Sequence, residues 1–244
     1  MTAGTELGTA DQPTSRPPAL GRLVTFEGID GAGKTTQLKR TEAWLTGSID
    51  RLSKGKHAAA THRFSRRVQI TREPGGTDLG GHLRQLLLSP EFAPSERTEL
   101  LLYAADRAQH VAEVIRPALT AGWLVLSDRF VDSTVAYQGY GRGLDLDEIQ
   151  QSIDLATGGL TSDLTLWFDV PIDLAIARRQ ARPSEDDRLE QSRRDFYERV
   201  RAGFTMLNHR DHDRVVRIEA SGSVDEIFAQ VQTVLGDRLH QWFG

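Results

Sequence analysis

Cysteine is absent from the 244 residues of this sequence. Disulfide bonds, thiolate metal sites and cysteine nucleophiles are therefore excluded together. Long hydrophobic runs are also missing, since no window approaches the roughly 18 apolar residues that a membrane helix needs. Residues 1–20 lack the basic start and apolar stretch of a secretory signal, so we expect no membrane partner and a cytoplasmic location.

A large excess of charge of one sign is missing as well, because 30 Lys and Arg stand against 34 Asp and Glu, a net charge of −4. This balance argues against a surface that tracks nucleic acid, so no stable nucleic-acid partner is expected. With 39% hydrophobic residues, the chain can form one large domain. We expect this domain over residues 21–244, after an unstructured Thr-, Pro- and Gly-rich tail over residues 1–20.

Short apolar runs alternate with longer helical segments after residue 20, which is typical of a parallel sheet covered by helices. Strands are predicted over residues 23–27, 68–71, 123–127, 164–168 and 215–218. Helices are predicted over residues 34–45, 77–88, 97–119, 146–156, 174–180, 189–207 and 224–241. Residues 23–26 and 124–126 are continuously apolar, which predicts two central strands. In such an α/β sheet, ligands bind at the carboxyl ends of the strands.

A phosphate-binding motif follows the first predicted strand: the segment 28–35, G-I-D-G-A-G-K-T, matches G-x-x-x-x-G-K-[ST]. Its glycines let backbone N–H groups face an anion, and the following helix points its positive end at the same place. Lys34 would reach the β- and γ-phosphates, and the Thr35 hydroxyl would ligate Mg²⁺. The segment predicts a nucleoside triphosphate held by Gly28, Asp30, Gly31, Ala32, Gly33, Lys34, Thr35 and Thr36.

Two residue pairs suggest an acceptor side. Asp128 and Arg129 follow a predicted central strand, where the carboxylate can hold Mg²⁺ through water and the guanidinium can hold a phosphate bidentately. Tyr103 and Arg107 lie four apart on a predicted helix, which suits stacking on a base and donating to its carbonyl. Taken alone, the pairs also fit a salt-bridged strand end and an ordinary helix surface.

A regulatory GTPase is disfavoured, because its guanine-reading N-K-x-D segment is missing: the single asparagine, Asn208, precedes His209. The seven histidines show no metal-ligand spacing, and phosphoryl transfer needs none of them.

Three further segments carry a family resemblance: residues 71–77 (T-R-E-P-G-G-T), residues 101–107 (L-L-Y-A-A-D-R) and residues 128–139 (D-R-F-V-D-S-T-V-A-Y-Q-G). With the phosphate loop they resemble the thymidylate kinase family in its bacterial form, from about residue 22 to the C-terminus. The resemblance implies a three-layer α/β P-loop nucleoside monophosphate kinase fold. Its five-stranded parallel sheet would have the order 2-3-1-4-5 and helices on both faces. The implied activity is phosphorylation of dTMP to dTDP with ATP and Mg²⁺, in dTTP biosynthesis, by a homodimer.

The resemblance also implies a role for individual residues. Tyr103 would stack on thymine and Arg107 would donate to its carbonyl, while Arg84 and Arg129 would hold the monophosphate. The expected substrate contacts are completed by Thr134 and Gln138 on the polar edge of the base, Tyr137 against the 2′ carbon of the sugar, and Asp30 and Glu73 near the sugar and phosphates. Lys34, Asp128 and Arg129 would be catalytic, and Thr35 and Asp128 would hold the metal.

Residues 178–190 resemble the mobile lid of the family. Thymidylate kinases carry a catalytic arginine either in the phosphate loop or in the lid, and Gly31 occupies the loop position here. Because charge on the transferring phosphoryl group needs a cation that arrives as water is expelled, the lid must supply it. Arg182 and Arg188 are the candidates.

Two further segments contain no catalytic or binding motif. Residues 47–67 are a basic insertion with no readable function, and residues 139–143 resemble a flexible loop of the family.

Three alternatives stay open. A kinase for another pyrimidine monophosphate, such as dUMP, is the nearest, because a methyl group in an apolar pocket discriminates by only about 1–3 kcal/mol. An inactive nucleotide-binding protein of the same fold and an ATPase switch without an acceptor are the others.

Overall fold

The computed structural model describes residues 21–47, 67–181 and 194–243. Five strands form one parallel sheet in the order β2-β3-β1-β4-β5, which confirms the predicted fold class and strand order. The strands are β1 (Arg22–Glu27), β2 (Val68–Arg72), β3 (Leu124–Asp128), β4 (Leu164–Asp169) and β5 (Val215–Glu219). The expected tail, most of the basic insertion and the lid beyond residue 181 lie outside the described residues.

β1 is the central strand and is hydrogen-bonded to β3 on one side and to β4 on the other. Phe26 of β1 pairs with Asp128 at the end of β3. Leu23, Val24 and Phe26 are fully buried, as expected for an apolar strand covered on both faces. The segments that follow β1 and β3 therefore emerge side by side at the carboxyl edge of the sheet.

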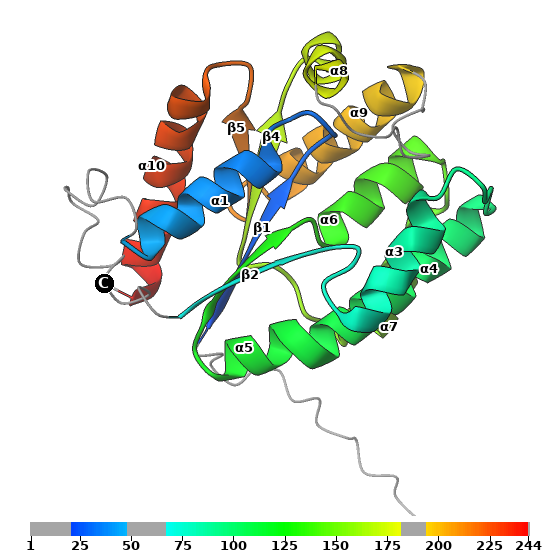
Figure 1. Cartoon of the computed structure of the whole chain (residues 1–244), viewed down its shortest axis with the longest axis horizontal. Coiled ribbons are helices and arrows are strands. Elements are labelled where there is room, and N and C mark those ends of the chain that lie inside the picture. The colour runs from blue at the N-terminus through cyan, green and yellow to red at the C-terminus, as the bar shows by residue number, and fades with distance from the viewer. Residues whose placement is uncertain (1–20, 48–66, 182–193, 244) are drawn as a thin grey trace, which may run out of the picture.

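Helices cover both faces of the sheet and give the three layers (Figure 1). On one face lie α1 (Lys34–Leu45) and α10 (Val224–Phe243), and on the other lie α4 (Glu96–His110), α5 (Arg116–Thr120) and α7 (Leu146–Thr157). Successive side chains of a strand point to opposite faces, so Val24 and Phe26 pack in one apolar cluster and Leu23 in the other. The helices α3 (Asp78–Leu88), α8 (Ile172–Gln180) and α9 (Arg194–Arg210) lie around these layers, and α9 contributes Phe196, Val200 and Phe204 to the first cluster.

The helix predicted over residues 97–119 is not regular throughout. A π-helical segment, Val111–Ile115, separates α4 from α5. Pro117 lies in the first turn of α5, and because proline has no N–H, the regular hydrogen-bond ladder cannot continue through it. The prediction of one uninterrupted α-helix was therefore wrong in this turn.

A helix that the sequence did not predict follows β3. α6 (Val131–Thr134) continues into a π-helical segment, Val135–Gly141, so residues 139–141 are not the loop that was expected. β-Branched residues and glycines give this stretch a low helix propensity. Packing against α9 stabilises it, and a Cβ on Gly141 would lie 2.8 Å from the ring of Phe196. Within the described residues, no helix has both the length and the apolar character required to cross a membrane.

Candidate active site

The phosphate loop leaves β1 at Gly28, and α1 begins at Lys34. Gly31 has a φ of 89°, in the left-handed region that favours glycine. A Cβ at this position would lie 2.3 Å from the carbonyl oxygen of Ala175 in α8. The loop therefore has no room for an arginine at Gly31.

Lys34 is held inside its own loop. Its Nζ donates to the carbonyl oxygens of Gly28 at 3.0 Å and Ile29 at 3.1 Å, and lies 3.7 Å from Oδ1 of Asp30. Burial, followed by the neighbouring Arg129 guanidinium, lowers the pKa of Lys34 from its ordinary value. The ammonium group therefore lies at the centre of the turn, where the loop motif would place phosphate oxygens.

Thr35 and Asp128, the two expected metal ligands, lie beside each other. The Thr35 hydroxyl donates to Oδ2 of Asp128 at 2.7 Å. A hydroxyl and a carboxylate are hard oxygen donors of the kind that Mg²⁺ binds, in company with substrate phosphates. The pair therefore fits Mg²⁺. Among the residues with described positions, no group of three His, Cys, Asp or Glu side chains could hold a metal ion. A metal at Thr35 and Asp128 would therefore also need oxygen ligands from the substrate phosphates or from water.

Arg129 connects the phosphate loop to the acceptor side. Its guanidinium donates to the Gly28 carbonyl at 3.1 Å, Asp30 at 2.5 Å, the Ser133 hydroxyl at 2.9 Å and the Tyr137 hydroxyl at 3.1 Å. Burial by itself would raise the pKa of Asp30, but Arg129 and then Lys34 hold it well below its usual range. Asp30 is therefore an anion between two cations.

The backbone of Arg129 is unusual. Its φ of 75° is the single positive value found among the non-glycine residues of the described chain. For a residue with a Cβ this conformation costs roughly 1–2 kcal/mol. Surrounding contacts must therefore hold the backbone in this position.

All nine expected substrate residues line one cavity, although they come from separate parts of the chain. The space between them measures about 550 Å³ including its open mouth. The expected residues are Asp30, Glu73, Arg84, Tyr103, Arg107, Arg129, Thr134, Tyr137 and Gln138. Four residues that the sequence did not single out also line the cavity, namely Pro74, Leu88, Phe130 and Ser133. This acceptor cavity meets the phosphate loop at Asp30 and Arg129.

Arg107 lines the cavity and also connects other residues of its wall by hydrogen bonds. It is 2% exposed and donates to Oε2 of Glu73 at 2.8 Å, to the Thr134 hydroxyl at 2.9 Å and to the Phe130 carbonyl at 3.1 Å. These bonds use three of the five guanidinium N–H groups, so two are left for a ligand.

His110 supports Glu73 from behind, with Nδ1 of the ring 2.9 Å from Oε1 of that carboxylate and Nε2 2.5 Å from the Thr71 hydroxyl. The ring is fully buried. Sequence reasoning set the histidines aside, and the one available signal was that His110 lies three residues after Arg107 on the same helix.

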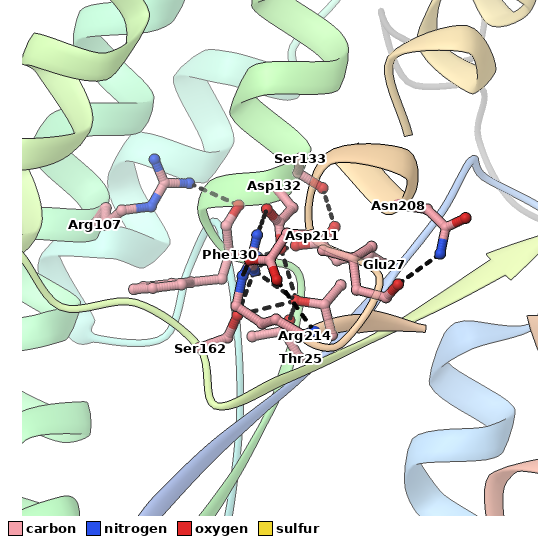
Figure 2. A network of polar contacts seen from close by, with 12 residues as sticks. Thr25, Glu27, Arg107, Phe130, Asp132, Ser133, Ser162, Asn208, Asp211 and Arg214 are labelled. Carbon is pink, nitrogen blue, oxygen red and sulfur yellow. Dashed lines mark hydrogen bonds and ion pairs between the residues drawn. The ribbon is translucent and has the colours of Figure 1, made fainter. Parts of the chain in front are cut away.

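A buried carboxylate at the end of β1, Glu27, holds the turn that carries Arg129. Oε1 of Glu27 accepts from the Phe130 N–H at 2.6 Å, and Oε2 accepts from the Ser133 hydroxyl at 2.5 Å (Figure 2). Burial, and then Asp132, raise the pKa of Glu27 to about 8, against the opposing effects of Arg129, Ser133 and Phe130. The signal in the sequence was a lone acid at the end of an apolar strand.

On the other side of this turn, Arg214 anchors α6 to the sheet. Its guanidinium donates to both oxygens of Asp132, at 2.7 and 3.0 Å, and to the Ser162 hydroxyl (Figure 2). The Thr165 hydroxyl of β4 also donates to Asp132, at 2.6 Å. Asp132 directly precedes Ser133, so this network and Glu27 fix the same turn from two sides. Nothing in the sequence pattern connected Arg214 with Asp132.

Beside the cavity, another buried carboxylate, Glu99, contacts the lining residue Gln138. It accepts from Nε2 of Gln138 at 2.9 Å and from Nε and Nη2 of Arg142 at 3.2 and 3.1 Å. Glu99 is 1% exposed and lies one turn before Tyr103 on α4. Sequence reasoning overlooked it as one of several acids near the start of that helix.

The described part of the expected lid is the end of α8. Arg178 donates to the carbonyl oxygens of Ala220, Ser221 and Gly222, which is a structural role. Arg179 donates to the Tyr197 hydroxyl at 2.7 Å, and its charge contributes to the low pKa of Asp30. The lid arginines Arg182 and Arg188 lie outside the described residues.

Comparison with known proteins gives a consistent result. Residues 26–231 match the family model described as thymidylate kinase. A thymidylate kinase of Thermosynechococcus vestitus is 49% identical over 226 residues, covering 93% of this chain and 91% of that protein. One of Cyanothece sp. is 47% identical over 231 residues, covering 91% of this chain and 97% of that protein. The crystal structure of thymidylate kinase from Ehrlichia chaffeensis superposes with a TM-score of 0.66 at 32% identity, covering 88% of this chain and 98% of that one.

Proposed function

The chain belongs to the thymidylate kinase family, and from this premise we propose how its residues divide the work of phosphorylating dTMP. It is an ATP-dependent nucleoside monophosphate kinase, and its reaction converts dTMP to dTDP. One observation supports this assignment of roles above all. The Arg129 guanidinium bonds Gly28 and Asp30 of the phosphate loop and also lines the acceptor cavity.

The phosphate loop is the proposed ATP site. Backbone N–H groups from Gly28 to Thr36 and the N-terminus of α1 would surround the β- and γ-phosphates. Lys34 would exchange its bonds to two loop carbonyls for bonds to phosphate oxygens. Its charge would then oppose the negative charge that moves between ATP and dTMP.

The acceptor cavity is the proposed dTMP site. Tyr103 would stack on the base, and Arg107, Thr134 and Gln138 would bond its polar edge. Arg84 and Arg129 would hold the monophosphate at the end of the cavity that faces Asp30. Glu73 would lie at the sugar end, and Tyr137 would fill the space beside the 2′ carbon, where ribose carries a hydroxyl.

The phosphoryl transfer needs no strong base, because an oxygen of the dTMP phosphate is already anionic at neutral pH. That oxygen forms a bond to the γ-phosphorus, the bond from this phosphorus to the β-bridging oxygen breaks, and ADP leaves with the electron pair. Lys34 and Arg129 would position the reactants and offset their charge, which supplies most of the catalysis.

Thr35 and Asp128 are the proposed protein ligands of Mg²⁺. The 2.7 Å hydrogen bond between them supports this assignment, because it brings two oxygen donors from different elements together at the loop. When bound, Mg²⁺ would offset the negative charge of the phosphate oxygens.

The catalytic arginine is proposed to come from the lid, as Arg182 or Arg188. The packing of Gly31 against Ala175 supports this proposal, because it leaves the alternative position in the phosphate loop too small for a side chain. α8, which provides that packing, also leads directly into the lid.

A homodimer is proposed through the helices on the α4 face of the sheet. Leu101 of α4 is 65% exposed and Leu155 of α7 is 88% exposed, while α4 and α7 pack against each other. Two exposed leucines on adjacent helices suit a self-complementary apolar contact. Sedimentation analysis of Leu155→Glu beside the unchanged protein tests it, and a dimer of unchanged stability would rule out this face.

The proposed assignments are tested by a coupled ADP-release assay with dTMP, dUMP or no acceptor, followed by a crystal structure with dTMP and an ATP analogue. We expect ADP release to depend on an acceptor and to be fastest with dTMP. Equal ADP release without an acceptor would favour an ATPase. A bound dTMP distant from Tyr103 and Arg129 would overturn the assigned site.

A further inference from the structure

Glu99 is a carboxylate buried beside the acceptor cavity, away from the phosphate chemistry. It lies in the first turn of α4 and is 1% exposed. Burial of a charge is costly unless it is paired and hydrogen-bonded. Arg142 supplies the pairing, because it donates from Nε and Nη2 as a fork, the arrangement of an ionised carboxylate.

An ionised carboxylate accepts hydrogen bonds and cannot donate them. The end of the Gln138 amide that faces Glu99 must therefore be its NH₂ group, and Nε2 lies 2.9 Å from Oε1 of Glu99. If the amide rotated by half a turn, two acceptors would face each other in a buried position. The contact with Glu99 therefore determines which way round the amide of Gln138 is held.

With its NH₂ group directed at Glu99, Gln138 has its carbonyl oxygen to offer to the cavity it lines. The neighbouring wall groups are donors. Arg107 is a donor only, and because it donates to the Thr134 oxygen, the Thr134 hydroxyl hydrogen is left to donate elsewhere. The wall thus combines one acceptor with donors on the adjacent residues.

This pattern complements one class of pyrimidine. Thymine and uracil present an N3–H donor next to carbonyl acceptors, whereas cytosine presents an N3 acceptor next to an amino donor. Cytosine would set its N3 against the Gln138 carbonyl and its amino group against the donors. A buried mismatch of this kind leaves polar groups unpaired.

We propose that Glu99 is a specificity-determining residue: by fixing the orientation of the Gln138 amide, it makes the cavity accept pyrimidines with an N3–H and reject cytosine. The inference rests on the proposed function, in which Gln138 bonds the base. Glu99 itself contacts no substrate in this scheme and acts as a positioning residue.

The test is Glu99→Gln, assayed for kcat/KM with dTMP, dUMP and dCMP. A glutamine can turn either end of its amide to Gln138, so the restraint on orientation is lost. In the unchanged protein we expect dTMP to be preferred over dCMP by about a thousandfold or more. In the variant this preference should fall by about tenfold or more, while the ratio of dTMP to dUMP stays within about twofold.

dUMP is the internal control, because it has the same polar edge as dTMP and differs only in the methyl group. A variant that merely loosened the cavity would change both ratios, and that result would overturn the proposal, as would a folded variant with neither ratio changed. Glu96→Gln is the matched control variant, since it makes the same change on an exposed residue in the same turn and should leave both ratios unaltered.

Two further variants complete the test. Should Glu99→Gln fail to fold, the double variant Glu99→Gln/Arg142→Met also removes the cation that lost its partner, and an unchanged preference over dCMP in that variant overturns the proposal. Gln138→Ala separates the two levels of inference. If it uses dTMP like the unchanged protein, the proposed base contact fails. If it loses activity while Glu99→Gln keeps its preference, only the role of Glu99 fails.

Discussion

The phosphate loop is one continuous segment, whereas the acceptor cavity takes its lining from five places: the phosphate loop, the segment after β2, α3, α4 and the segment after β3. In the loop, Lys34 bonds two carbonyl oxygens of its own turn. In the cavity, Arg107 bonds Glu73 and Thr134, and Arg129 bonds Asp30, and all three partners are distant in sequence. The loop is therefore shaped by its backbone, while the cavity is shaped by bonds among the same side chains that would bind dTMP. Substitutions should therefore affect turnover in the loop, and both binding and stability in the cavity.

Lys34→Ala should give the largest effect and should fall on turnover. Loss of a positioned cation at the transferring phosphate is expected to lower kcat by about a thousandfold. The affinity for dTMP, measured by titration calorimetry, should change by less than about threefold, because the cavity keeps its own bonds. Lys39→Ala, an exposed lysine further along α1, is the control. A parallel loss of dTMP binding would break the contrast between loop and cavity.

Arg129→Ala should affect both properties, because this residue belongs to both regions. We expect kcat/KM for dTMP to fall by about a hundredfold or more, and the free energy of unfolding to fall by about 2 kcal/mol as Asp30 loses the nearer of its two cationic partners. Arg129→Gly should be equally inactive yet about 1 kcal/mol more stable than the alanine variant, since φ is 75°. Urea unfolding measures the difference, and wild-type turnover in either variant would refute the assignment.

Tyr103→Ala should chiefly weaken dTMP binding. A stacking contact is worth roughly 1–3 kcal/mol, so KM for dTMP should rise by about 5- to 150-fold while kcat stays within about twofold. Tyr103→Phe keeps the aromatic plane and should remain near the unchanged protein. Steady-state kinetics at saturating ATP provide the measurement. A fall in kcat alone would show that Tyr103 acts on the chemical step instead.

Glu27→Gln should remove a pH dependence of stability. Because the pKa of Glu27 is raised from 4.5 to about 8, the folded protein keeps a proton that the unfolded chain has released between these values. The contribution of Glu27 to the free energy of unfolding therefore falls as pH rises from 5 to 8, by up to about 1.4 kcal/mol per unit. Urea unfolding at several pH values should show this slope in the unchanged protein and a flatter curve in the variant. Identical curves would exclude a titrating Glu27.

The parts of this molecule that were predictable from its sequence are those fixed by local patterns. Short apolar runs located all five strands of the sheet, and the two continuously apolar runs identified β1 and β3, whose side chains are buried. The helix over Val131–Thr134 and the π-helical segment after it were missed, since their residues favour other structures and packing against α9 stabilises them. The break before Pro117 could have been foreseen from the missing N–H.

The site residues could likewise be predicted where a local motif or a family resemblance identifies them, and not where they depend on distant partners. The loop residues follow from one motif, while the nine cavity residues were expected from the family resemblance, and the structure brings all nine together. Glu27, Glu99 and Asp132 were not anticipated as a group, because their importance comes from burial and from partners far away in sequence. A single sequence contains no pattern that pairs Asp132 with Arg214.

The pairing of β1 with β3 has one more consequence. The ATP loop and Arg129 emerge from neighbouring strands, so their separation is governed by the spacing of hydrogen-bonded chains, about 4.8 Å. That length is a property of the peptide bond network and is almost incompressible. Substitutions can change side chains on either side of this junction. The distance between the phosphate loop and the backbone of Arg129 is set by the sheet, so a point mutation cannot change it.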